Sequence, residues 1–328
     1  MEGYSVDVFF QTAIYVTNAT SIPVKLFSMY IIVFHAPKHL QQVSLFILNE
    51  TFWNFSANLL FCIGAFIPMM PSQCFKFGGL ASHFIDAELG DHLFFKLAYI
   101  SGIQSGCAIV LSFQFRYAAI CHSHRIKNMS HVWGYVYCVC FHVLFTVFYI
   151  LLVNQWELNL SDYPIQSEIF GKTNLFCYNP EPKNKLIYAS GLSFIFLFFG
   201  IAVLHAVFFS FRQMKKNEQM ICKETIKAQK TVLWNLVMLS SVPIVMGVLP
   251  LLIGEIFVYF RYFANAKLAF GILMIVMLNL GTVYGILTLY LFKDYRRAVK
   301  RMFLRCVGKG GIVSNGTITV VVRSITVV

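Results

Sequence analysis

The sequence predicts an all-α membrane protein, in which seven membrane-spanning helices form a bundle and a short amphipathic helix follows the seventh span. Three observations lead to this fold class. The chain is 58% hydrophobic and only 12% charged, whereas a soluble domain carries about 25% charged residues. Its apolar runs repeatedly reach the roughly 20 residues that a helix needs to cross a bilayer. Basic residues gather at every second connection between these runs, as they do in membrane proteins.

Seven segments are long enough to cross a membrane, and the first is the weakest because polar residues interrupt it. They cover residues 10–33, 44–68, 93–117, 132–153, 186–211, 231–253 and 268–292. The chain therefore divides into an outer N-terminus at 1–9, the bundle at 10–292, an interfacial helix at 293–306 and a mobile cytosolic tail at 307–328. The first residues lack a basic segment, so we expect the first span to serve as the insertion signal.

Lysine and arginine residues orient the predicted bundle. Of the 26 such residues, 18 fall in the odd-numbered connections and the tail, 6 fall in the even-numbered connections, and Lys25 and Lys96 lie within spans. Because loops kept in the cytosol collect Lys and Arg, the N-terminus is expected outside and the C-terminus inside. The net charge of +12 would suggest nucleic acid in a soluble protein. Here the charge lies beside membrane spans, which favours lipid headgroups or an acidic cytosolic partner and no nucleic acid.

Ionisable side chains inside membrane spans are costly and commonly functional. Arg116 lies one turn inside the inner end of span three and precedes Tyr117. It either takes part in switching or anchors the helix at the headgroups. Lys25 and Glu50 lie at similar depths on spans one and two, so they either pair with each other or reach separate polar neighbours. Lys96, near the outer end of span three, either faces a ligand or extends to the interface.

The outer loops contain two cysteines and one well-placed glycosylation sequon. Cys74 follows span two, and Cys177 lies in the loop after span four. In an oxidising compartment the two are expected to form a disulfide, with two free thiols as the alternative. Of the sequons in the chain, only that of Asn159 is comfortably placed in an outer loop, so Asn159 is the expected glycosylation site.

Spans six and seven contain features typical of a bundle that changes shape. Pro243 and Pro250 lie seven residues apart on roughly one face of span six. Because proline frees backbone carbonyls and permits a kink, this span is a candidate lever, and a static bend is the alternative. Span seven contains Asn279 and Tyr284 among glycines, a small and polar stripe suited to helix packing.

The cytosolic segments are basic and contain further helix patterns. No Pro or Gly interrupts residues 212–230, so we expect spans five and six to continue as helices into the cytosol. Apolar residues recur at helical spacing over 293–306 with basic residues on the other face, which predicts a helix in the inner membrane interface. Cys306 ends this helix and is a candidate for acylation. Thr326–Val328 at the C-terminus suit a PDZ-type groove.

Motifs of the common enzyme classes are absent. The chain contains no HExxH, no GxSxG and no Gly-rich phosphate loop. The cysteines do not form a CxxC zinc framework, and Cys138 and Cys140 are expected to face lipid or core. We therefore expect neither an enzyme nor a cofactor or metal site.

Four stretches of the chain resemble the nematode serpentine chemoreceptors. They are LFILNETFWNFSANLL in span two, FQFRY closing span three, KAQKTVLWNLVMLSSVPIVMGVLP through span six and LGTVYGILTLYLFKDYRRAV at the end. The resemblance is to class H, with the related class I as a near alternative, and it runs roughly from Thr20 to Phe303. It implies a seven-helix, G-protein-coupled receptor in the plasma membrane of the sensory cilium of chemosensory neurons. Its partners would be a small odorant or other chemical cue, membrane lipids and a heterotrimeric G protein.

The resemblance extends to the Arg–Tyr pair at the inner end of span three. The family shows an acidic residue and Asn before this pair, where this chain has Gln114 and Phe115. Arg116 and Tyr117 therefore match the family without the carboxylate that would hold the arginine, and we expect appreciable signalling without ligand. The residues assigned to coupling and switching are Arg116, Tyr117, Pro243, Pro250, Asn279 and Tyr284.

The ligand is expected in the outer half of the bundle. The outer parts of spans three, five, six and seven are mainly aromatic and aliphatic, which predicts a small and largely apolar ligand. The candidate contacts on span three are Lys96, Tyr99 and Ile103. A ligand-gated channel or transporter of the seven-helix type is the alternative, although the chain shows no internal repeat of the kind that transporters contain.

Overall fold

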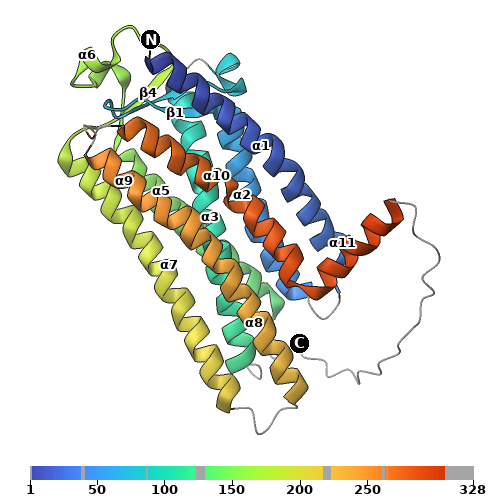
Figure 1. Cartoon of the computed structure of the whole chain (residues 1–328). Coiled ribbons are helices and arrows are strands. Elements are labelled where there is room, and N and C mark those ends of the chain that lie inside the picture. The colour runs from blue at the N-terminus through green and yellow to red at the C-terminus, as the bar shows by residue number, and fades with distance from the viewer. Residues whose placement is uncertain are drawn as a thin grey trace.

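The computed structural model describes residues 2–306 except 38–40, 86–87, 123–129, 217–222, 261–262 and 264. Long helices lie side by side along most of the molecule, with a small sheet at the end where the N-terminus lies (Figure 1). The long helices are α1 (Glu2–His35), α2 (Gln41–Gly64), α3 (Glu88–Cys121), α5 (His131–Asn154), α7 (Pro182–Lys216), α8 (Lys223–Pro243), α9 (Leu249–Tyr259), α10 (Ala266–Leu291) and α11 (Lys293–Cys306).

The seven predicted spans correspond to seven helical stretches, because α8 and α9 are joined by the π-helical segment η5 (Ile244–Val248) into one. Six stretches within the described residues are long and apolar enough to cross a membrane: Val6–His35, Gly90–Cys121, Val132–Asn154, Pro182–Lys216, Glu224–Tyr259 and Ala266–Leu291. The seventh is α2, whose polar residues lower its hydropathy. Glu50, Thr51 and Asn58 of α2 are buried, and α2 contacts α1, α3 and α10.

The second predicted span is wrong at its outer end. Residues 44–68 were expected to be helical throughout, but α2 ends at Gly64 and Phe66–Pro68 form strand β1. The helix ends because Ala65 adopts a positive φ of 41°, a left-handed conformation that reverses the chain at a helix C-terminus. The Ala65 N–H still donates to the Phe61 carbonyl at 2.8 Å.

The structure is an all-α bundle as predicted, and a small four-stranded antiparallel sheet that the sequence did not predict covers its outer end. The strands are β1, β2 (Cys74–Phe77), β4 (Leu175–Tyr178) and β3 (Glu157–Leu158), in that order across the sheet. Their length of two to four residues is too short to give an alternating sequence pattern. The pairing joins the loop after α2 to the loop after α5, which are far apart in the sequence.

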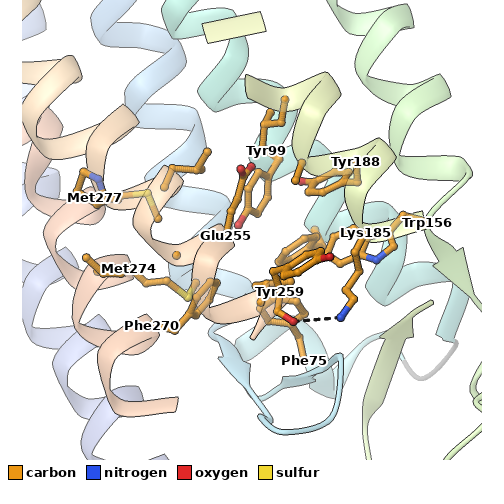
Figure 2. A pocket seen from close by; sticks show the side chains of 18 residues that line it. Phe75, Tyr99, Trp156, Lys185, Tyr188, Glu255, Tyr259, Phe270, Met274 and Met277 are labelled. Atoms are coloured by element: carbon orange, nitrogen blue, oxygen red, sulfur yellow. Dashed lines mark hydrogen bonds between the residues drawn. The ribbon is translucent and has the colours of Figure 1, made fainter. Parts of the chain in front are cut away.

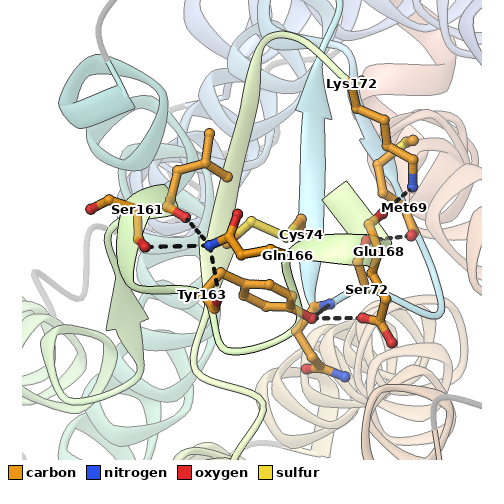
Figure 3. The surroundings of a disulfide bond; sticks show 11 residues. Met69, Ser72, Cys74, Ser161, Tyr163, Gln166, Glu168 and Lys172 are labelled. Atoms are coloured by element: carbon orange, nitrogen blue, oxygen red, sulfur yellow. Dashed lines mark hydrogen bonds between the residues drawn. A yellow bond between two sulfur atoms is a disulfide. The ribbon is translucent and has the colours of Figure 1, made fainter. Parts of the chain in front are cut away.

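A disulfide joins the two central strands of this sheet. Cys74 of β2 and Cys177 of β4 are register partners, and their sulfurs are bonded. Figure 3 shows Tyr163 beside this disulfide, where its hydroxyl donates to Glu168 at 3.0 Å and accepts from the Gln73 N–H at 3.1 Å. The two central strands are therefore joined by a covalent bond, and the buried Tyr163 holds the loop after β3 against the sheet.

Aromatic side chains fill the space between the outer sheet and the helices. The ring centroids of Phe75 and Phe176 on the sheet are 5.7 Å apart, and Phe75 lies 4.7 Å from Phe95 of α3. Phe66 also packs edge-on against Phe95 at 5.0 Å. Because aromatic pairs favour such offset and edge contacts, this cluster fixes the sheet over α3 and closes the outer end of the core.

The predicted ion pair between Lys25 and Glu50 is wrong. The Glu50 carboxylate accepts a hydrogen bond from the Tyr284 hydroxyl of α10. The Lys25 ammonium is fully buried and has no hydrogen-bond partner among the described residues. A side chain added at Gly281 would lie 2.4 Å from Lys25 Cε and 1.8 Å from Asn54 Oδ1. Lys25 is thus level with Asn54, which lies one helical turn beyond Glu50.

The predicted helices on the cytosolic side are present. α7 continues to Lys216 and α8 begins at Lys223, so both extend past the apolar part of their spans. α11 follows α10 directly and runs away from the bundle axis (Figure 1). Its Tyr295 hydroxyl is 2.5 Å from the Ser44 hydroxyl of α2. Phe303 near the end of α11 is 68% exposed, as expected for a helix lying in a membrane interface.

Candidate functional site

A cavity opens directly beneath the outer sheet, between α3, α7, α9 and α10. Its empty space is about 640 Å³, part of it open to solvent. The sheet and the loop after α5 contribute Phe75 and Trp156, and α3 contributes Phe95 and Tyr99. The other lining residues are Lys185, Tyr188, Ala189 and Leu192 of α7, Pro250, Leu251, Gly254, Glu255, Val258 and Tyr259 of α9, and Phe270, Leu273, Met274 and Met277 of α10.

Trp156 is held in place at the wall of this cavity. Its ring stacks between Tyr178 and Tyr188, with centroid distances of 4.3 and 4.2 Å. The indole N–H donates to the Asn179 carbonyl at 3.0 Å. Burial raises the pKa of Tyr178 on β4, so this hydroxyl stays neutral at physiological pH. The stack therefore gives the cavity a rigid aromatic wall.

Two charged residues line the cavity, and their surroundings differ. The Lys185 ammonium donates to the Tyr259 carbonyl at 3.3 Å and lies 5.2 Å from the centroid of the Tyr259 ring. Glu255 of α9 points into the cavity toward Tyr99 (Figure 2). Its Oε1 atom is shielded from solvent and has no hydrogen-bond partner among the described residues.

Of the three ligand contacts predicted on span three, the structure places one in this cavity. Tyr99 lines it, but Lys96 and Ile103 do not. Lys96 forms an ion pair with Glu157 of β3 and donates to Asn154 Oδ1 at 2.9 Å. Ile103 is 3% exposed and packs in the hydrophobic core. Lys96 therefore links α3 to the outer sheet through Glu157. Its side chain extends toward the end of α5, which is why it does not line the cavity.

Sequence reasoning missed Glu255 as a cavity residue. Span six was expected to end at residue 253, which left Glu255 in an outer loop. In the structure α9 continues to Tyr259. The absence of Pro or Gly from residues 255–259 was the signal that could have extended this helix. Trp156 and Phe75 were also missed, because they reach the cavity only through the outer sheet.

The cavity borders a break in the helix of span six. α8 ends at Pro243, the π-helical segment η5 follows, and α9 begins at Leu249 with Pro250 as its second residue. Pro250 is buried and lines the cavity. A π-helical turn inside an α-helix marks a site of weakened backbone bonding and is frequent at functional sites. The two prolines thus border an irregular segment that lies between the cavity and α8.

The Arg–Tyr pair lies at the inner end of α3. Arg116 is half-buried, and its Nε has no hydrogen-bond partner in the part of the chain that the structure describes. Gln114 accepts a hydrogen bond from the Tyr137 hydroxyl of α5 at 2.8 Å, so position 114 faces α5. Tyr117 lines a second hollow of about 1,070 Å³, part of it open to solvent, with His122 and with Arg212 of α7.

A comparison with protein families decides the class of the protein. The family model for the serpentine type 7TM GPCR chemoreceptor Srh matches residues 5–305. The chain belongs to this family. No curated protein matches the chain. The protein is therefore a multi-pass membrane chemoreceptor, its family is not one of enzymes, and the match gives no support to the alternative of a channel or transporter.

The other predicted residues of this chemoreceptor have varied surroundings. Asn279 donates to the Ile275 carbonyl of its own helix at 2.9 Å, and Tyr284 donates to Glu50. Asn159 is exposed beside the outer sheet. Cys306 is the last residue of α11, but its side chain lies outside the described residues, as do residues 307–328 with the predicted tail. No group of three or more His, Cys, Asp or Glu side chains within the described ranges is arranged to hold a metal ion.

Proposed function

We propose that this chemoreceptor binds a small ligand in the cavity beneath the outer sheet and activates a cytosolic heterotrimeric G protein. The observation that carries the proposal is the position of the cavity. It lies between α3, α7, α9 and α10, and one of its walls contains Pro250 beside the π-helical segment. A ligand that contacts this wall touches the least regular part of a helix whose other end lies on the cytosolic side.

The proposed orientation places the N-terminus outside and the C-terminus in the cytosol of the plasma membrane. Three features at the sheet end of the molecule support it: the disulfide, the exposed Asn159 and the excess of acidic residues in the outer loops. The basic ends of α7 and α8 and the basic face of α11 lie at the other end, as the positive-inside rule requires. By family the cell surface would be that of the sensory cilium.

The proposed signal is a shift between two arrangements of the bundle. A ligand changes their populations only if it binds one arrangement more tightly than the other. The segment from Pro243 to Pro250 can absorb a change in backbone angles, since its π-turn lacks the regular α-helical bonding. Movement of α8 would then alter the surroundings of Arg116 and Tyr117. The basic surface of α7, α8 and α11 would attract an acidic face of the G protein and raise its rate of association.

The test is to block the cavity without disturbing the rest of the bundle. Ala189→Trp on α7 adds an indole to the cavity lining and should abolish the second-messenger response to an activating odorant mixture in transfected cells. Gly200→Trp is the matched control on the same helix, because a side chain there meets no atom within 4 Å. Surface delivery is measured with an N-terminal tag. A full response from Ala189→Trp at normal surface levels would show that the ligand binds elsewhere.

A further inference from the structure

The cavity contains an acidic side chain, Glu255, that forms no hydrogen bond or ion pair with the described residues. Glu255 Oε1 is shielded from solvent and lacks a hydrogen-bond partner among the described residues. A buried oxygen of this kind is costly, so native structures rarely leave one without a partner or a role. Glu255 lies four residues before the end of α9, about 6 Å along the helix from Tyr259. It is therefore inside the cavity and not at the outer surface.

The lysine that lines the same cavity is engaged with another group. Lys185 donates to the Tyr259 carbonyl, and its ammonium lies over the Tyr259 ring. No ion pair between Lys185 and Glu255 is present in the structure as described. The carboxylate thus remains available to a molecule that enters the cavity.

The rest of the wall suits a cation. Tyr99, Trp156, Tyr188 and Phe270 present aromatic rings to the cavity, and Met274 adds a polarizable thioether. Aromatic faces attract organic cations through the ring quadrupole. Tyr99 and Tyr188 lie close enough to Glu255 to interact with it electrostatically. An ammonium beside Glu255 would therefore meet a carboxylate on one side and aromatic rings on others.

We propose that the ligand of this receptor is a compact organic amine, bound as its ammonium ion with the nitrogen at Glu255 and its apolar body among the aromatic rings. This inference rests on the proposed function, because it names the ligand class for the same cavity. An anionic ligand would be repelled by the Glu255 carboxylate. A neutral alcohol can donate only a single uncharged hydrogen bond, which is weaker than a charge-assisted one.

Binding can be tested on the purified full-length receptor without any assay of signalling. The probes are isobutylamine, cyclohexylamine and 2-phenylethylamine, each paired with the alcohol of the same skeleton, and 3-phenylpropionate as an anion. Binding is measured as concentration-dependent thermal stabilisation of the receptor in lipid nanodiscs. At least one amine should stabilise the receptor, and its alcohol partner should bind roughly tenfold to a hundredfold more weakly, as expected for loss of a charged hydrogen bond.

Three variants test whether amine binding depends on the Glu255 carboxylate. Glu255→Gln keeps the shape and should weaken amine binding by a similar factor, while Glu255→Asp keeps the charge and should retain part of the affinity. Glu181→Gln removes an exposed acidic group elsewhere on the outer face and should leave amine binding unchanged. The unliganded melting temperature of each variant shows that it is folded.

The outcomes separate the ligand class from the proposed function. If an alcohol or 3-phenylpropionate stabilises the receptor as well as the amines do, the cavity is a ligand site but the amine inference is overturned. If Glu255→Gln binds the amines as tightly as the wild type, or if no amine stabilises the receptor, the inference is also overturned. The cavity itself is tested independently by the Ala189→Trp signalling experiment.

Discussion

At the residue scale, Lys25 is the least expected feature of the bundle. Its ammonium is fully buried on α1 and has no hydrogen-bond partner among the described residues. A buried polar group without a partner costs about 1–3 kcal/mol, and more if it is charged. The sequence suggested Glu50 as its partner, but the Tyr284 hydroxyl already bonds that carboxylate. Lys25 therefore lowers the stability of the folded bundle.

We predict that Lys25→Met stabilises the receptor, since methionine fills a similar volume without a buried charge. The expected gain is about 1–3 kcal/mol in the free energy of unfolding. It is measured as a higher melting temperature of the purified protein. Lys300→Met, at an exposed position of α11, is the matched control and should change little. A lower melting temperature for Lys25→Met would mean that Lys25 forms a favourable interaction with a bound molecule.

The surroundings of Arg116 lead to a second prediction at this scale, which concerns signalling. Gln114 occupies the place where the family resemblance implies an acidic residue, and it accepts a hydrogen bond from the Tyr137 hydroxyl of α5. Because Nε of Arg116 has no partner within the described residues, the arginine is only weakly held in this arrangement. It is thus free to contact a cytosolic partner.

We predict that Arg116→Ala abolishes G-protein signalling while surface delivery stays normal. Lys183→Ala is the control, because it removes an exposed cation at the sheet end of α7, away from the basic surface proposed to meet the G protein, and it should signal at nearly the wild-type level. Both are measured as second-messenger production with and without ligand, normalised to surface tag. A normal response from Arg116→Ala would make this arginine a headgroup anchor only.

At the element scale, the most irregular helix of the bundle is span six, in which a π-helical segment separates α8 from α9. Pro243 cannot donate a backbone hydrogen bond, and η5 begins at the next residue. The sequence placed both prolines but could not decide between a lever and a static bend. A π-turn between them provides a segment whose bonding can change at little cost.

We predict that Pro243→Ala lowers the maximal response to ligand, because the restored N–H favours a regular helix that transmits less movement. Ligand affinity should change by less than about threefold, since Pro243 does not line the cavity. Dose–response curves give both quantities. Pro182→Ala at the exposed first residue of α7 is the control, as proline there costs little. An unchanged maximal response would identify the break as a static bend.

At the scale of the whole molecule, the distribution of charge follows the long axis of the bundle. The sheet, the disulfide and Asn159 lie at one end, and the basic ends of α7, α8 and α11 lie at the other. In a membrane this arrangement allows only one favourable orientation. The outer end would then be in an oxidising compartment, where a disulfide persists.

We predict an extracellular N-terminus, a cytosolic C-terminus and a glycan on Asn159. A tag at the N-terminus should stain in intact cells. A tag at the C-terminus should stain only after the cells are permeabilised. Asn159→Gln and Ser161→Ala should each remove the gel shift caused by a glycosidase, whereas Ser167→Ala, outside any sequon, should not. A cytosolic N-terminal tag would contradict both the orientation and the proposed function.

The sequence by itself determined the helices and their order, and it predicts their orientation. A membrane helix must satisfy its backbone hydrogen bonds within its own segment, so each span is encoded locally as a run of apolar residues. The amphipathic pattern of α11 and the uninterrupted ends of α7 and α8 are local in the same way. Charge at the connections is also a local signal, and from it we predict which end faces the cytosol.

Only the tertiary structure decided how these helices are rotated and what joins their outer ends. The outer sheet pairs Cys74 with Cys177, which are 103 residues apart, through strands too short to be seen in the sequence. The orientation of each helix about its own axis places Glu50 against Tyr284 and Lys25 against Gly281. It also directs Glu255 into the cavity. Such contacts depend on the packing of several helices at once, and no single segment of the chain contains that information.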